Sequence, residues 1–414
     1  MKRVFTLLFL LINAVAYGQD TLNVMFYNLY RFPVMPPANR QTILKDILDS
    51  YHPDIFMTCE LVNESGADHI LNVSLNHQQQ RYLRAPFVFT QSDTTDPLQQ
   101  MVFYNKEKLT LVQQRTYKTT VRDINHYTFL LNTENIAGDS IFIDAFVTHL
   151  KSSEGPANRQ LRLGMIDTFF NHVEDVPNGH YVLLGGDFNF YSAYNEPAYQ
   201  KLIATNNPVT MVDPIHMPGK WSNNDSFKAI HTQATRISSE GFGTGGASGG
   251  MDDRFDYIMM SQNLEQTGVL QYIQDSYKAY GNNGNCFNNR IDAYDCDGEY
   301  PLELRQNLYK MSDHVPIVMQ LKTDRHFTSV PQLPVAAGIK FPNGNMVKDF
   351  LIIDVNKIRL AANDFAVYNS LGQKMLLKTE RNGTFISIDF RNVKPGIYYL
   401  ICAGKNVSFK IVRM

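Results

Sequence analysis

Short apolar runs alternate with polar loops from about residue 21 to residue 323, and this alternation predicts a protein rich in β-strands. The runs are rich in β-branched and aromatic residues, and Gly, Pro, Asn or Asp bound them. Two other segments, 39–51 and 158–173, carry apolar residues at helical spacing. Strands and helices therefore mix along this part of the chain, and an α/β fold is expected. Seven segments fit best as strands: 21–29, 54–60, 99–105, 140–150, 180–188, 254–260 and 314–321.

Alternation with a period of two returns near the C-terminus, after a Pro-containing stretch at 324–343. We therefore expect a main domain at 19–323, a linker at 324–343 and a small all-β domain at 344–414. About seventy residues make a domain that is only marginally able to fold alone. The period-two segments of this last domain are 365–377, 383–390, 396–404 and 406–414.

Residues 1–18 have the three-part pattern of a secretory signal peptide. Lys2 and Arg3 precede an apolar run at 4–12, and the small residues Ala16 and Gly18 follow it. The alternative, a membrane anchor, needs a longer apolar run, because a spanning helix takes about 20 residues. We expect cleavage after Gly18 and export through the periplasm to the cell surface or the medium. No later segment looks long and apolar enough to span a membrane, so a soluble mature monomer is expected.

The chain has four cysteines, and an exported protein can form disulfides. Cys286 and Cys296 bracket a short loop with few packing residues, and we expect them to bridge. Cys59 and Cys402 lie in apolar, strand-like runs, so both are expected to be small core residues.

The charge is unevenly spread along the chain. The formal net charge is -2, but residues 341–414 carry 11 Lys and Arg against 5 Asp and Glu. The tail is therefore basic and the rest is acidic. Nucleic-acid binders usually show a basic surface, which the main domain lacks in bulk. A local basic patch is still compatible with this bulk charge. Its candidate residues are Arg84, Arg115, Arg122 and Lys151.

Acidic, amide and imidazole side chains stand at or near the ends of the strand-like runs. Asp187 and Asn189 follow the apolar run 181–184, where a turn that caps the backbone is the ordinary interpretation. Burying one such polar group costs free energy unless it is paired. A shared site therefore explains the whole set better than a separate structural role for each, such as a satisfied core histidine. The other members are Asn28, Glu60, His149, Asp256, Asp313 and His314.

Two of these residues suggest a hard cation. Asn28 and Glu60 offer oxygen ligands, which suit Mg²⁺ or Mn²⁺ bound together with substrate phosphate. The cysteines and histidines lack the spacing of a structural zinc site. A divalent cation would offset the negative charge that develops on a phosphate.

The remaining residues suggest hydrolysis of a phosphoester. Asp187 can polarise an attacking water that Asn189 orients. His314 can donate to a phosphoryl oxygen if a buried carboxylate keeps it protonated, and Asp256 is the candidate for that carboxylate. His149 supplies a second imidazole, for protonation of the leaving group. These parts predict a metal-assisted phosphoester hydrolase.

These residues, in this order, resemble the endonuclease/exonuclease/phosphatase superfamily, which has the DNase I-like fold. The motifs are "YNLY", "TCE", "THLKS", "GGDFN", "RFDYI" and "SDHVP". The resemblance implies a four-layer αββα sandwich with the site at one edge of its two sheets. It implies that Asn28 and Glu60 hold the cation and that Asp313 is a further metal or water ligand. Arg159 or Arg162, after "THLKSS", would reach phosphate; the alternative is an ordinary surface arginine of a helix.

The substrate is not fixed by these motifs. We expect a nuclease or a general phosphodiesterase, although an acidic main domain argues against tight duplex binding. A sphingomyelinase-like phospholipid substrate and a small phosphate ester are the alternatives. A non-catalytic binding protein or adhesin on the same scaffold would have lost site residues, and none is missing.

Three loops or tails have interpretations of their own. The glycine-rich segment 238–250 is expected to be a flexible connector. The tail resembles the C-terminal sorting domain of type IX secretion, through "NSLGQ", "PGIYYL" and a lysine in the last strand. This resemblance implies contact with the secretion machinery; a glycan-binding β-sandwich is the alternative.

The loop 292–300 offers a structural Ca²⁺ site, or else is a solvated acidic loop. Its acids are Asp292, Asp295, Asp297 and Glu299.

Overall fold

The structure is a computed structural model of the chain. The expected signal peptide at 1–18 and most of the expected linker lie outside the residues that it describes. Among the described residues, no helix is both long and apolar enough to cross a membrane. The described residues are 20–93, 95, 97–134, 140–238, 246–328, 339, 341–342, 345–355, 360–369, 372–402 and 407–413.

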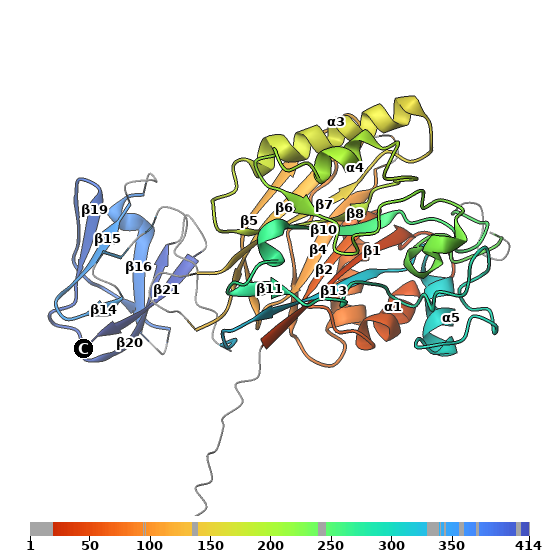
Figure 1. Cartoon of the computed structure of the whole chain (residues 1–414). Coiled ribbons are helices and arrows are strands. Elements are labelled where there is room, and N and C mark those ends of the chain that lie inside the picture. Colours follow the sequence, from red (N-terminus) through yellow and green to blue (C-terminus); the bar gives the residue numbers. More distant parts are fainter. Residues whose placement is uncertain are drawn as a thin grey trace, which may run out of the picture.

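Two β-sheets pack face to face in the main body (Figure 1). All seven segments expected to be strands contain one. The first sheet has the order β11 (Leu270–Tyr272), β13 (Ile317–Thr323), β1 (Asp20–Phe32), β2 (Ile55–Leu61), β4 (Gln99–Asn105) and β3 (Tyr82–Arg84), and β12 (Lys278–Ala279) also pairs with β13. The second has the order β5 (Leu109–Tyr117), β6 (Ile124–Leu131), β7 (Phe142–His149), β8 (Tyr181–Asp187), β10 (Asp256–Ser261) and β9 (Met211–Val212).

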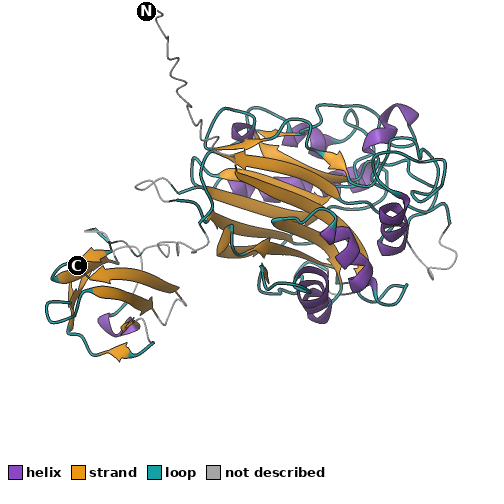
Figure 2. Cartoon of the chain, turned by 90° about the horizontal axis from the view of Figure 1, so that it is seen from below, coloured by secondary structure: helices purple, strands orange, loops and turns teal. Residues whose placement is uncertain are grey.

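Helices cover the outer faces of both sheets. In Figure 1, α3 (Pro156–Val173) and α4 (Pro197–Leu202) lie above the second sheet, and α1 (Arg40–Asp49) and α5 (Leu302–Met311) lie below the first. Figure 2 shows the strands of the main body side by side, with helices around them. The four-layer αββα sandwich is thereby confirmed. The shorter helical elements are α2 (Glu64–His69), η1 (Ile70–Leu75), η2 (Asp225–Ile230), η3 (Gln262–Leu264) and η4 (Ala362–Asp364).

Strand β8 shows why its sequence is a continuous apolar run. Leu183 belongs to the core between the two sheets, whereas Val182 and Leu184 belong to the core under α3. Side chains alternate between the two faces of a strand. Because β8 is covered on both faces, nearly every position in it is apolar.

The two glycines at the end of β8 are required by close packing. A Cβ atom added to Gly185 would lie 2.7 Å from Cε of Met57 in the opposite sheet. One added to Gly186 would overlap the carbonyl oxygen of Thr148 on β7. The pair therefore lets the end of β8 approach its neighbours, which brings the following Asp187 close to the side chains of β2 and β7.

The described part of residues 339–413 forms two small antiparallel or mixed sheets around a core of its own. It contains no α-helix among its described residues, in agreement with the expected all-β tail. One sheet has the order β14 (Met346–Val347), β21 (Val407–Arg413), β20 (Gly396–Cys402), β16 (Phe365–Asn369) and β17 (Lys374–Met375). The other has the order β15 (Phe350–Asp354), β19 (Phe385–Asp389) and β18 (Thr379–Asn382).

Candidate active site

Strand ends from both sheets deliver the candidate residues to one edge of the sandwich. In the second sheet, Asp187 is the register partner of His149 on one side and of Asp256 on the other. In the first sheet, Asn28 pairs with Cys59, the residue before Glu60. The groups are thus placed by strand pairing, and hydrogen bonds join them across the two sheets.

Asn28 is the hub of this network. Its Nδ2 donates to Oε1 of Glu60 at 3.1 Å and to Oδ2 of Asp187 at 3.0 Å, and it lies 3.3 Å from Nε2 of His314. Its Oδ1 accepts the backbone N–H of Tyr30 at 3.0 Å. Asn28 is fully buried, so these contacts fix the distance between the two sheets at the site.

Glu60 occupies a strained backbone position at the end of β2. Its φ is 58°, in the left-handed region that few residues other than glycine adopt. The register of β2 shifts between Thr58 and Leu61, which turns this residue out of the regular ladder. The backbone N–H of Arg31 donates to Oε2 of Glu60 at 3.2 Å. Burial, followed by repulsion from Asp313, raises the pKa of the Glu60 carboxyl.

Asp187 and Asn189 form the pair expected from "GDFN". Asn189 donates to Oδ1 of Asp187 from its Nδ2 at 2.8 Å and from its backbone N at 3.2 Å. Its φ of 54° is also left-handed, a conformation that asparagine tolerates better than most residues. Burial raises the pKa of Asp187 to about 8; His314 opposes this shift, and Asp256 and Glu60 add to it. Asp187 is therefore a stronger base than an ordinary carboxylate.

His314 and Asp256 form the closest imidazole–carboxylate contact of the site. Nδ1 of His314 lies 2.7 Å from Oδ2 of Asp256, and both side chains are buried. Burial lowers the pKa of His314, but the charges of Asp256 and Asp313 outweigh it and raise that pKa well above the usual value. His314 is therefore an imidazolium whose Nε2 faces Asn28 and Asp187.

His149 lies on the other side of Asp187. Its Nε2 is 3.5 Å from Oδ2 of Asp187, and its buried Nδ1 has no hydrogen-bond partner among the described residues. Burial, with the charges of Arg122 and His314, holds the pKa of His149 well below its usual value. A neutral imidazole does not suit the expected protonation of the leaving group, and His149 fits better as a hydrogen-bond partner of the substrate.

Asp313 lies at the same edge but has different partners. Its Oδ2 accepts the backbone N–H of Ala247 at 2.6 Å, and its Oδ1 is 4.0 Å from Nε2 of His314. Ala247, in the described part of the glycine-rich segment, therefore contacts the site, and residues 239–245 of that segment lie outside the described residues.

The donor set fits a hard divalent cation. Ligand atoms of Glu60, His149 and Asp187 all lie within 4.8 Å of one another, and so do those of Asp187, Asp256 and His314. Desolvation raises the pKa of Glu60 and of Asp187, and repulsion from neighbouring carboxylates adds to it; a bound cation would offset that repulsion. Glu60 would hold the cation, with Asn28 beside it. Its chemistry, when bound, would be to polarise a phosphoryl oxygen and to stabilise developing negative charge.

The arginines expected at the phosphate have other roles. The guanidinium of Arg162 is fully buried, pairs with Oε2 of Glu196 at 2.7 Å and donates to the carbonyls of Lys151 and Ser153. The expectation that Arg162 reaches phosphate is therefore wrong, because its donors are committed inside the protein. Arg159 pairs with Glu154 at 2.9 Å and has no contact with the site residues in the described structure.

The expected basic patch is divided. Arg84 pairs with Glu64 and Asp68 at 2.8 and 2.9 Å, so its charge is balanced there. Arg122 instead donates to the carbonyl oxygen of Leu150 at 3.1 Å, next to His149. Lys151 follows directly, and burial together with Arg122 lowers its pKa. Of the four residues proposed for the patch, Arg122 and Lys151 thus lie near the site.

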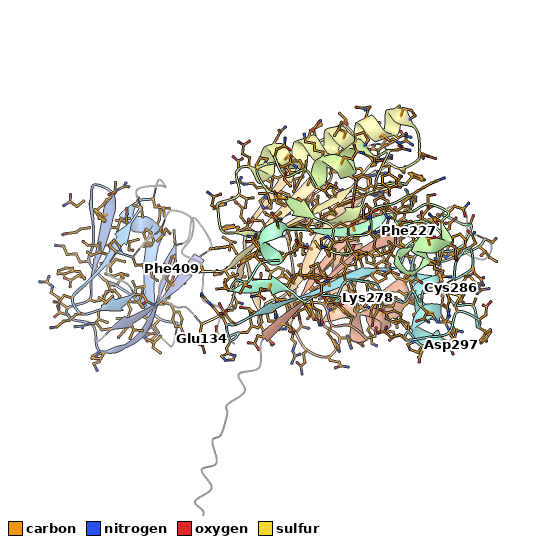
Figure 3. All side chains as sticks on the ribbon, viewed as in Figure 1. Glu134, Phe227, Lys278, Cys286, Asp297 and Phe409 are labelled. Carbon is orange, nitrogen blue, oxygen red and sulfur yellow. A yellow bond between two sulfur atoms is a disulfide. The ribbon has the colours of Figure 1, made fainter. Side chains whose placement is uncertain are left out.

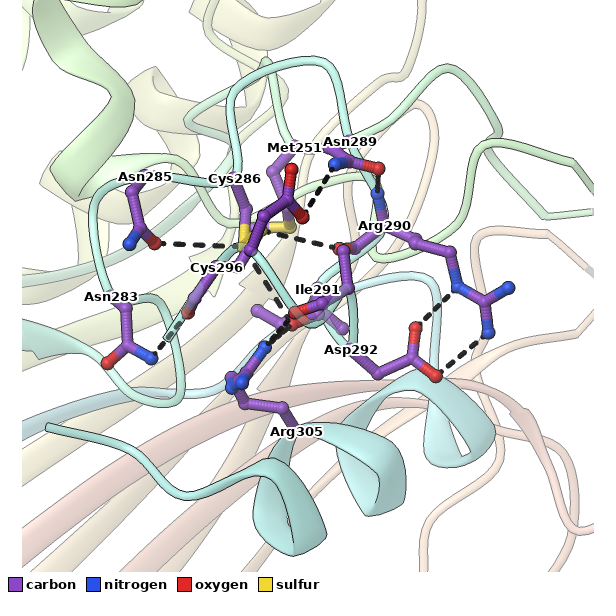
Figure 4. The surroundings of a disulfide bond; sticks show 12 residues. Met251, Asn283, Asn285, Cys286, Asn289, Arg290, Ile291, Asp292, Cys296 and Arg305 are labelled. Carbon is purple, nitrogen blue, oxygen red and sulfur yellow. Dashed lines mark hydrogen bonds and ion pairs between the residues drawn. A yellow bond between two sulfur atoms is a disulfide. The ribbon is translucent and has the colours of Figure 1, made fainter. Parts of the chain in front are cut away.

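A disulfide joins Cys286 to Cys296 at the end of the main body beside α5, as Figures 3 and 4 show. Cys59 and Cys402 take no part in that disulfide and are buried, as core residues should be. The acids of the bridged loop do not converge as a calcium site would require. Arg290 donates to both carboxylate oxygens of Asp292, at 2.6 and 2.8 Å. The side chain of Asp297 is 86% exposed. A solvated acidic loop is the better description.

Gln233 is a site residue that the sequence did not indicate. Its Nε2 lies 2.7 Å from Nε2 of His314. The segment around it, 232–235, lies outside any helix or strand and has no apolar period. Its proximity to His314 arises from isolated bridges to Asp253 and His314, which no local pattern reveals.

The fold and this site define a phosphoester hydrolase with the DNase I-like architecture. A model of the Endonuclease/Exonuclease/phosphatase family matches residues 25–314. The chain belongs to that family. No curated protein matches the sequence.

Several solved structures are similar to the chain at low identity. Zebrafish (D. rerio) TDP2 complexed with a single-strand DNA product is 16% identical with a TM-score of 0.46, over 73% of this chain and 100% of that one. The human Nocturnin catalytic domain is 15% identical with a TM-score of 0.44, over 74% and 97%. A mannosyl-6-phosphatase of Bacteroides thetaiotaomicron is 14% identical with a TM-score of 0.43, over 72% and 99%.

Proposed function

We propose that this protein is an exported, divalent-cation-dependent phosphodiesterase that acts on nucleic acid. The observation that carries the proposal is the convergence of Asp187, with its raised pKa, and the His314–Asp256 pair on one buried point. A base and a cationic donor that flank one position are what hydrolysis of a phosphate ester requires.

The residues then take the following roles. Asp187 accepts the proton of a water that Asn189 orients, as the water oxygen bonds to phosphorus and the ester P–O bond breaks. The leaving oxygen takes a proton from solvent. The Nε2–H of His314 donates to a non-bridging phosphoryl oxygen, and Asp256 keeps that ring charged and oriented. His149 contacts a second phosphoryl oxygen. Asn28 fixes Asp187 and Glu60 relative to one another.

Two exposed aromatic side chains support nucleic acid as the substrate. Phe89 is 63% exposed and Tyr194 is 66% exposed. Phe89 precedes Thr90, whose backbone N–H donates to Gln99 at the start of β4, at the same edge as the site. Tyr194 lies in the loop that follows Asp187. Bases of a single strand stack on such side chains without sequence preference.

Export remains a proposal from the sequence. The pattern of residues 1–18 supports a signal peptide, and the all-β tail supports a sorting domain of type IX secretion. Expression of the whole chain in a host with that pathway, followed by mass spectrometry of the secreted protein, would test both. Secreted protein that begins after Gly18 is expected, whereas retention of the intact chain in the cytoplasm would contradict it.

The substrate is tested with the mature chain, residues 19–414, in Mg²⁺ and in EDTA. Plasmid DNA, single-stranded DNA, RNA and sphingomyelin vesicles are offered in parallel. We expect EDTA-sensitive cleavage of nucleic acid, and its loss in Asp187→Asn and His314→Ala. Hydrolysis of the vesicles alone would replace nucleic acid by a phospholipid. Activity that survives both substitutions would show that the roles are wrongly assigned.

A further inference from the structure

Gln233 lies where a substrate phosphate would meet His314. Its carboxamide approaches Nε2 of His314 at 2.7 Å, on the ring nitrogen that Asp256 does not occupy. Asn28 approaches the same nitrogen at 3.3 Å. Any phosphoryl oxygen that accepts from this nitrogen must therefore lie within reach of the Gln233 side chain.

The backbone around Gln233 is held firmly. Its N–H donates to the carbonyl of Asp253 at 3.0 Å, and its carbonyl accepts from the backbone N–H groups of Asp252 and Asp253 at 3.0 and 2.8 Å. The neighbouring Thr232 accepts the backbone N–H of Val315 at 2.8 Å. The segment thus runs between the chain that carries Asp256 and the chain that carries His314.

The side chain itself is free to serve a ligand. Gln233 is partly exposed, and its close approach to His314 is the one side-chain contact found for it within the described residues. Both nitrogens are donors when His314 is charged, so this contact does not use up the donor of the carboxamide. A carboxamide has both a donor and an acceptor end. Its oxygen can accept from the charged ring in the free protein, and its N–H can donate to a phosphoryl oxygen when substrate enters.

The charges around His314 suggest which substrate this arrangement suits. Asp256 lies 2.7 Å from Nδ1, and Asp187 and Asp313 lie 3.8 and 4.0 Å from Nε2. The two closest neighbours of Nε2, Asn28 and Gln233, are neutral amides. These amides add no positive charge beside Nε2, so a second negative charge on the substrate is offset less here than it would be beside an arginine.

We propose that Gln233 is a specificity-determining residue, which donates to a phosphoryl oxygen beside His314 and selects the singly charged phosphodiester over the doubly charged monoester. This inference rests on the proposed function and names a residue that sets its preference for the diester.

The test compares kcat/KM of the mature protein for bis(p-nitrophenyl) phosphate and for p-nitrophenyl phosphate, in Mg²⁺. Gln233→Ala should lower the value for the diester by about 10- to 100-fold, since a hydrogen bond to a charged group is lost. Gln233→Arg should lower the ratio of diester to monoester hydrolysis by about tenfold, because an added cation favours the dianion. Gln271→Ala is the matched control, because Gln271, on β11, is also partly exposed and donates to the carbonyl of Gly268.

If Gln233 had a purely structural role, its substitution would change the midpoint of thermal unfolding and leave the diester-to-monoester ratio unchanged. Both quantities are therefore measured. Wild-type kcat/KM and an unchanged ratio in Gln233→Ala and Gln233→Arg, in an enzyme that His314→Ala inactivates, would overturn this inference and leave the proposed function standing. A wild-type protein without any cation-dependent phosphoesterase activity would overturn both.

Discussion

Asp256 places its carboxylate oxygen Oδ2 2.7 Å from Nδ1 of His314, at a point where neither residue is exposed to solvent. Asp256 begins β10, and His314 precedes β13 of the other sheet. The contact therefore bridges the two layers of the sandwich. A buried carboxylate at this distance fixes the ring orientation and keeps the imidazole charged.

Removing that charge should impair hydrolysis without unfolding the protein. Asp256→Asn keeps the shape of the side chain but no longer holds His314 as an imidazolium, so kcat should fall by about 10²- to 10⁴-fold. Steady-state kinetics with a chromogenic diester measure the change. Asp225→Asn is the control, since Asp225 is 61% exposed in the 3₁₀ turn η2. Equal kcat for Asp256→Asn and wild type would remove Asp256 from the mechanism.

The cation should stabilise the fold as well as support activity. Glu60 is half-buried and Asp187 is buried. Both carboxyls have raised pKa values, and a bound divalent ion offsets the repulsion that contributes to them. At Mg²⁺ or Mn²⁺ concentrations about 100 times the dissociation constant, the free energy of unfolding should rise by about 2.7 kcal/mol. Thermal unfolding with added cation or EDTA measures this, and Glu60→Gln should reduce the shift. A thermal unfolding midpoint that neither Mg²⁺ nor Mn²⁺ changes would argue against the assigned ligands.

The two glycines of β8 should differ in their tolerance of alanine. Gly186→Ala should cost about 1–3 kcal/mol of unfolding free energy, because the new methyl group meets the backbone carbonyl of Thr148. Gly185→Ala should cost less, because it meets the flexible end of Met57. Gly164, in the middle of α3, has no atom within 4 Å of an added Cβ.

Gly164→Ala is therefore the matched control, and it should stabilise the helix by about 0.5–1 kcal/mol. Denaturant unfolding of the three variants gives the comparison. An unfolding free energy of Gly186→Ala equal to that of wild type would mean that β7 and β8 do not approach each other as the structure shows.

A buried Asp144 network should make stability depend on pH in the acid range. Oδ1 of Asp144 lies 2.7 Å from Nε2 of His126, and Oδ2 lies 2.6 Å from Nδ1 of His180. Burial raises the pKa of Asp144, but hydrogen bonds from His126, His180 and Thr128 outweigh it and lower that pKa from 3.8 to about 2. The network lies on β7, five residues before His149.

A carboxyl whose pKa is depressed in the folded state stabilises the fold above its unfolded pKa. Asp144 should therefore contribute about 2 kcal/mol near neutral pH, and this contribution should be lost as pH falls from about 4 to about 2. Urea unfolding of wild type and Asp144→Asn as a function of pH measures the difference. A constant gap between the two proteins across that range would contradict the depressed pKa.

Much of the fold was predictable, because its strands are local apolar runs between turn formers. The seven predicted segments include the strands that position the site, and Asn28, Glu60, Asp187 and Asp256 could be found because they stand at or near the ends of those runs. The αββα layering followed from the family motifs. Strand pairing within the second sheet then brings His149, Asp187 and Asp256 side by side.

The failures come from interactions between distant segments. Arg162 looked available for phosphate because nothing local shows its partner Glu196, which lies 34 residues further along. Gln233 was missed because residues 232–235 have no periodic pattern, and contacts with Asp253 and His314 determine their position. Such irregular segments take their conformation from the elements around them.

The central claim is that Asp187 and His314 act on one phosphate. A double-mutant cycle tests it most directly, through kcat/KM of wild type, Asp187→Asn, His314→Ala and the double variant on a chromogenic diester. Residues that act as one unit show strongly non-additive losses, so the double variant should be hardly slower than the worse single variant. Losses that multiply, as they do for independent positions, would contradict a shared site.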